Sequence, residues 1–179
     1  TTNGSDPDGS NEDDDPDEDA STSVSFEEDP VLGLAKRVSQ GPQSNGDGTY
    51  NLTFEIRVEN NGNINLDSLQ VGDNLAAVFG TDCDWTIDGL SSDEFTVNDS
   101  YNGVSDTLLL QGDDELKSWD EGAIYLSLTV GPCTDLGPFN NSATGTAKTP
   151  TGEEIMDISQ TGSEPDSDGD GETDDNDEP

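Results

Sequence analysis

The chain contains no histidine and only five lysine and arginine residues among 179. Histidine is the commonest general base and a usual ligand of transition metals, so its absence argues against an enzyme and against a transition-metal site. The shortage of positive charge excludes nucleic acid and anionic membrane surfaces as partners. No hydrophobic stretch approaches the length of a membrane span, so we expect no membrane insertion.

Acidic residues are what the chain has in excess. It carries 42 aspartates and glutamates and a formal net charge of -37, and self-repulsion on this scale destabilises a compact state unless cations neutralise it. Half of the acidic residues lie in residues 1–30 and 163–179, and all five basic residues lie between these segments. The sequence therefore predicts an acidic linker at 1–22, a folded domain at 23–162 and a second acidic linker at 163–179.

The second acidic linker has the spacing of a calcium-binding loop. Loop positions 1, 3, 5, 9 and 12 all carry aspartate, and Gly171 stands at position 6, where such a loop turns sharply. Calcium is a hard ion that prefers carboxylate oxygen, so Ca²⁺ is the expected cofactor. The predicted metal ligands at this end are Asp166, Asp168, Asp170, Glu172, Asp174 and Asp177.

Two departures distinguish this loop from a helix-loop-helix calcium site. Position 12 is Asp177 in place of the longer glutamate, and Pro165 and Pro179 stand where flanking helices would continue. These departures favour a linker site over an EF-hand. The alternative is a solvated acidic tail with no specific site, which is the ordinary meaning of a charge run.

The N-terminal linker repeats the spacing less cleanly. Its position 6 is Asn11, a residue that tolerates the left-handed turn usually made by glycine. Either a second calcium site lies here, or a dense aspartate run matches the spacing by chance. The ligands of this second site would be Asp6, Asp8, Ser10, Asp14 and Asp17.

The pattern of the central domain is that of strands. Residues 50–59 alternate apolar and polar side chains, and residues 123–130 are rich in β-branched and aromatic types. A single helical turn is expected at residues 73–79. Short strands separated by turn signals predict an all-β sandwich. The shorter strands are expected at residues 32–38, 66–71, 85–87, 95–97, 107–110, 140–147 and 155–158.

Two cysteines, Cys83 and Cys133, have no metal-type spacing. A disulfide between them would contribute about 2–4 kcal/mol, mainly through the unfolded state, and would indicate an oxidising compartment. The alternative is a pair of buried thiols.

Six short motifs, taken in order, resemble the Ig-like conserved-repeat domain of large secreted bacterial surface proteins. The resemblance implies an Ig-like antiparallel β-sandwich in a tandem structural or adhesive protein at the cell surface, with no catalytic residues. The C-terminal loop separately resembles the calcium repeats of thrombospondin type 3. The motifs are residues 29–38 (DPVLGLAKRV), 50–62 (YNLTFEIRVENNG), 101–106 (YNGVSD), 108–112 (LLLQG), 137–143 (GPFNNSA) and 157–163 (DISQTGS).

Three functional hypotheses follow. The first is a calcium-stabilised extracellular subunit or repeat that joins neighbouring copies end to end into a filament, stalk or surface array. The extended segment 22–26, with apolar Val24 and Phe26, is either a strand that crosses to a neighbour or the first strand of its own domain.

The second hypothesis is an adhesin or carbohydrate-binding module. Its glycan or surface-protein partner would meet some of the tryptophans and tyrosines, although core packing explains most of them. The third is an acidic surface-layer protein of a salt-loving organism, without a specific metal site. The tryptophans and tyrosines considered for the second hypothesis are Tyr50, Trp85, Tyr101, Trp119 and Tyr125.

Overall fold

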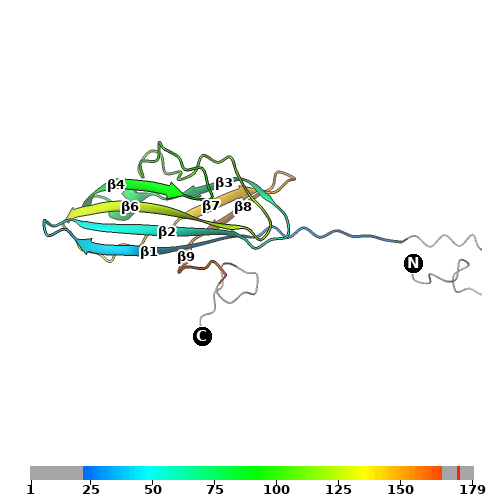
Figure 1. The fold of residues 1–179 in the computed structure, drawn as a ribbon, viewed down its shortest axis with the longest axis horizontal. Coiled ribbons are helices and arrows are strands. Elements are labelled where there is room, and N and C mark those ends of the chain that lie inside the picture. The colour runs from blue at the N-terminus through cyan, green and yellow to red at the C-terminus, as the bar shows by residue number, and fades with distance from the viewer. Residues whose placement is uncertain (1–21, 167–172, 174–179) are drawn as a thin grey trace, which may run out of the picture.

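A computed structural model describes residues 22–166 and residue 173 (Figure 1). These residues form two sheets packed as an all-β sandwich, with strand orders β4-β6-β2-β1-β9 and β5-β3-β7-β8. All pairings are antiparallel except that of β1 with β9. The elements are β1 Leu32–Ser44, β2 Tyr50–Asn60, β3 Leu66–Gly72, α1 Leu75–Phe79, β4 Cys83–Ser92, β5 Asp114–Leu116, β6 Glu121–Cys133, β7 Thr144–Lys148, β8 Glu154–Ile158 and β9 Gln160–Thr161.

The core lies between the sheets and is built from alternate residues of the central strands. Ile56 and Val58 of β2 and Leu126 of β6 are fully buried, whereas Arg57 between them points outward. This is the period-two pattern expected of a strand with one face in the core. The strands predicted at residues 50–59 and 123–130 are therefore confirmed. Within the described part of the chain, no helix is long and apolar enough to cross a membrane.

Strand β1 is unusual because both of its faces are covered at its start. Leu34 points between the sheets, where it leaves no room for a side chain on Gly145 of β7. Gly33 points the other way, toward Pro165 and Thr173 of the C-terminal segment. In Figure 1 this segment lies along the outer side of β1, beyond β9.

A disulfide joins the two sulfur atoms of Cys83 and Cys133, which confirms that prediction. The two residues lie directly opposite each other in the pairing of β4 with β6. The bond therefore fastens an edge strand to its central neighbour.

Two strand predictions are wrong. Residues 95–97 and 107–110 contribute only isolated bridges, of Val97 with Leu110 and of Leu108 with Gly72. Side chains take several of the backbone hydrogen bonds here: Asn98 Nδ2 donates to the Leu108 carbonyl, and Gln70 accepts the Leu110 N–H through Oε1 and donates to the Leu110 carbonyl through Nε2. Such side-chain bonds compete with a regular ladder.

The aromatic residues divide between core and surface. Tyr101 is buried and Trp85 packs against the core, as core packing predicts. Trp119 is 71% exposed and Tyr125 is 39% exposed, so core packing does not account for these two.

The segment that precedes β1 is extended and forms no strand, so it is not the first strand of its own sandwich. Val24 and Phe26 are 71% and 91% exposed. Asn63 holds the segment to the domain: its backbone N–H donates to the Asp29 carbonyl at 3.0 Å, its Oδ1 accepts the Asp29 N–H at 2.8 Å, and its Nδ2 donates to the Glu27 carbonyl at 3.1 Å. Figure 1 shows it leaving from one end of the sandwich.

Candidate metal centre

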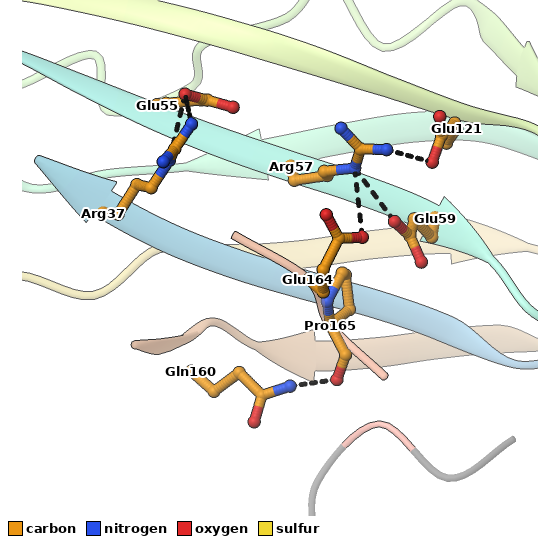
Figure 2. Close-up of polar contacts among 8 residues, drawn as sticks. All are labelled: Arg37, Glu55, Arg57, Glu59, Glu121, Gln160, Glu164 and Pro165. Atoms are coloured by element: carbon orange, nitrogen blue, oxygen red, sulfur yellow. Dashed lines mark hydrogen bonds and ion pairs between the residues drawn. The ribbon is translucent and has the colours of Figure 1, made fainter. Parts of the chain in front are cut away.

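Three glutamates meet on the outer face of the five-stranded sheet (Figure 2). Glu59 of β2 lies opposite Glu121 of β6 in the strand pairing, and Glu164 reaches the same place from the C-terminal segment. One carboxylate oxygen of each residue lies within 4.8 Å of the other two. Three carboxylates at this spacing are able to hold a metal ion, and no further aspartate, glutamate or cysteine side chain among the described residues joins the group.

Arg57 is the cation that the three glutamates share. Its Nε lies 3.0 Å from Glu59 Oε1 and 3.7 Å from Glu164 Oε2, and its Nη2 donates to Glu121. One guanidinium facing three carboxylates leaves a net negative charge on this surface. The cluster is therefore electrostatically suited to a further cation.

Burial raises the pKa of Glu59, although the ion pair with Arg57 opposes the shift. Repulsion from Glu164 and Glu121 raises the pKa of Glu59 further. A cation bound here would favour the ionised carboxylate and relieve this cost. Calcium takes about six to eight oxygen ligands, so the three glutamates would need other donors to complete a calcium shell.

The C-terminal segment is held against β1 by backbone and side-chain contacts. Strand β9 pairs in parallel with β1, and the Gly162 N–H donates to the Lys36 carbonyl at 3.1 Å. Gln160 Nε2 donates to the carbonyl of Pro165, which is buried (Figure 2). The chain is therefore fixed to the domain up to the first residue of the predicted calcium loop.

The residues that flank 166–172, Pro165 and Thr173, reach the same point on β1. A Cβ atom placed on Gly33 would lie 2.8 Å from Pro165 Cβ and 2.6 Å from Thr173 Cγ2. Thr173 is buried, and its hydroxyl donates to the Leu32 carbonyl at 3.3 Å. Glycine at position 33 thus provides the space in which Pro165 and Thr173 pack.

One predicted ligand, Asp166, is among the described residues, and it is half-buried beside Pro165. The other predicted ligands remain predictions because they lie outside the described residues: Asp168, Asp170, Glu172, Asp174 and Asp177 at the C-terminal end, and Asp6, Asp8, Ser10, Asp14 and Asp17 at the N-terminal end.

Sequence reasoning missed the glutamate cluster. Glu59 and Glu121 lie 62 positions apart and meet only through the register of β2 with β6. Glu164 belongs to the predicted acidic linker but precedes the calcium spacing. The alternation of β2 indicated that Glu59 faces outward, but no signal in the sequence indicated its neighbours.

Replacing Gly33 with valine should displace the C-terminal segment and leave the sandwich folded. The atoms nearest to the added Cβ belong to Pro165 and Thr173, at distances that force them to move, and valine suits a strand. Limited proteolysis followed by mass spectrometry should show faster cleavage after residue 162 in Gly33→Val. Gly89→Val is the matched control, because a Cβ on Gly89 of β4 meets no atom within 4 Å. Equal cleavage in both variants would contradict the docking described above.

Searches against protein-family models and against curated proteins give no match. Solved structures with a similar arrangement include the full-length major pilin SpaD of Corynebacterium diphtheriae, at 18% identity and a TM-score of 0.47, over 72% of this chain and 33% of the pilin. Another is an inactive mutant of an exo-β-N-acetylglucosaminidase of Vibrio harveyi, at 15% identity and a TM-score of 0.39, over 74% of this chain and 18% of the enzyme. This chain therefore spans a third or less of each protein, and likenesses at this level establish no function.

Proposed function

We propose that this chain is an extracellular structural module that binds calcium in its C-terminal acidic loop and joins neighbouring modules end to end. The observation that carries the proposal is the convergence of Pro165 and Thr173 on Gly33. Pro165 precedes loop position 1 and Thr173 stands at loop position 8, so the part of the loop between them is held at both of its ends, and less entropy is lost when it closes around an ion. Asp174 and Asp177 follow this held part.

The N-terminal segment is anchored near the point of β1 where Thr173 packs, and this supports a cation site there. Asp29 and Val31 are hydrogen-bonded to the loop after β2, immediately before Leu32, whose carbonyl accepts the Thr173 hydroxyl. The segment that leads to the N-terminal acidic linker and the segment that leads to the C-terminal one are therefore both anchored near the start of β1. In the proposed junction the like charges of the two linkers would repel each other, and calcium bound there would turn this repulsion into a stiff junction.

The disulfide supports an extracellular location, because disulfides persist in oxidising environments. The exposed Val24 and Phe26 offer a second way to contact a neighbour. The edge strand β8 exposes apolar Met156 and Ile158, and a crossing strand would add to such an edge through main-chain hydrogen bonds.

Thermal melting in calcium and in sodium chloride at equal ionic strength tests the proposal. At a calcium concentration of about 100 times Kd, binding to one site stabilises the folded state by about 2.7 kcal/mol, so calcium should raise the melting temperature and sodium should not. The triple substitution Asp166→Asn, Asp168→Asn and Asp170→Asn should abolish the calcium effect.

The matched control changes the same number of exposed acids outside the site, with Asp84→Asn, Asp99→Asn and Asp113→Asn, and should keep the calcium effect. If sodium chloride reproduces the stabilisation, the acidic surface acts as a general cation binder, as the salt-loving alternative requires. If neither salt changes the melting temperature, calcium does not stabilise this module.

A further inference from the structure

A lysine occupies a position in the core where the strand pattern calls for an apolar residue. Lys36 shares the inward face of β1 with Leu34, and its side chain is 3% exposed. Its Nζ lies 4.7 Å from the centre of the Phe54 ring and 2.5 Å from Oδ2 of Asp73, whose side chain is fully buried. A buried charge pair of this kind costs desolvation and adds little stability. Its presence calls for another explanation.

The third member of the group is Asn141, which lies just before β7. Its Nδ2 lies 3.4 Å from Asp73 Oδ2, the same oxygen that contacts Lys36 Nζ. The Oδ1 atoms of Asp73 and Asn141 are both buried without a hydrogen-bond partner among the described residues. The Lys36 amine and the Asn141 carboxamide thus contact the same carboxylate oxygen. Hydrogen bonds among the described residues leave two buried oxygen atoms of this group without a partner.

Asp73 is held rigidly at this point. Its N–H donates to the Thr107 carbonyl at 2.8 Å, and its own carbonyl accepts the Tyr101 hydroxyl at 3.1 Å. Burial lowers the pKa of Lys36, although its contact with Asp73 opposes the shift. Burial therefore favours the neutral amine, which is the nucleophilic form.

We propose that Lys36 and Asn141 become joined by an amide bond between Lys36 Nζ and Asn141 Cγ, with Asp73 as the group that transfers protons. Asp73 accepts a proton from the Lys36 ammonium, and the neutral Nζ attacks Cγ. Asp73 then passes this proton to the departing Nδ2 and accepts the second proton that Nζ must lose, the Cγ–Nδ2 bond breaks, ammonia leaves, and Asp73 ends the reaction protonated. One C–N bond forms and one breaks, so the step needs no oxidant, reductant or cofactor.

The surroundings suit this reaction. A cavity of about 430 Å³ is lined by Asp73 and Asn141, and it provides space for the ammonia to leave. The new bond would link β1 of one sheet to the segment that enters β7 of the other. It would tie the two layers together through β1, the strand on which the C-terminal segment docks, and it does not depend on calcium.

Mass spectrometry of the intact, reduced full chain tests the proposal. The bond removes one ammonia, so the chain should weigh about 17 Da less than its sequence requires. Trypsin should then release a branched peptide that joins residues 1–37 to residues 118–148, because the modified Lys36 is no longer cleaved and the next sites are Arg37, Lys117 and Lys148. Lys36→Met and Asn141→Ala should each have the full sequence mass.

Asn140→Ala is the matched control, since Asn140 is the exposed neighbour of Asn141 and its substitution should leave the branched peptide intact. Asp73→Asn should reduce or abolish the mass loss, because the amide cannot accept the proton. A wild-type chain with its full mass would overturn the proposal whether or not the variants fold. So would a mass loss that maps to any other pair of residues.

Discussion

Leu126→Ala should lower the free energy of unfolding by about 2–5 kcal/mol, the range for truncating a fully buried leucine. Leu126 lies on the inner face of β6, between β2 and β4, and is 0% exposed. Its partners across the sheet are Phe54 and Leu90, which are fixed in two neighbouring strands. The rigid strand ladders should prevent the site from collapsing, so part of the cost is the cavity that remains.

Urea unfolding followed by tryptophan fluorescence measures this loss. Leu136→Ala is the control, because Leu136 is 75% exposed in the loop after β6 and its truncation should change the unfolding free energy by no more than about 0.5 kcal/mol. Equal losses in the two variants would mean that the core does not lie between the two sheets as described.

Loss of the disulfide should cost about 2–4 kcal/mol. Cys83 and Cys133 are 50 positions apart, so the bond closes a long loop in the unfolded chain and reduces its conformational entropy. In the folded state the two residues already face each other across β4 and β6. The double substitution Cys83→Ser and Cys133→Ser should therefore unfold at lower urea concentration with its sandwich intact.

Circular dichroism of this double variant distinguishes a loss of stability from a loss of the fold. The far-ultraviolet spectrum should match that of the oxidised wild type, while the urea midpoint falls. Adding a reductant should lower the midpoint of the wild type and leave that of the variant unchanged. A midpoint that does not respond to reduction would show that the bond contributes nothing to stability.

The long strands were predictable because each has one face in the core. Alternation over residues 50–59 and 123–130 located the central strands, and Asn74 caps α1 by accepting the Ala77 N–H, within the helical turn expected at residues 73–79. The short strands β5 and β9 carry no such pattern. Their pairing depends on neighbours that lie far away in the sequence.

The candidate sites also differ in whether they depend on local sequence or on strand pairing. The calcium spacing from Asp166 onward is local, so it was visible in the sequence, whereas the cluster of Glu59, Glu121 and Glu164 depends on strand register. The contacts among Lys36, Asp73 and Asn141 could not be predicted for the same reason, although Lys36 and Asn141 both lie in motifs that carried the family resemblance. Those motifs were recognisable in the sequence, but the meeting of their side chains is a property of the fold.

The central claim is that the C-terminal acidic loop, docked on β1 through Gly33, binds calcium. Calorimetric titration of the full chain with calcium chloride at constant ionic strength tests it most directly. We predict saturable binding that is weakened by Gly33→Val and lost in the triple variant at Asp166, Asp168 and Asp170, but retained in the triple variant at Asp84, Asp99 and Asp113. The absence of saturable heat in the wild type, or undiminished binding in the loop variant, would contradict the claim.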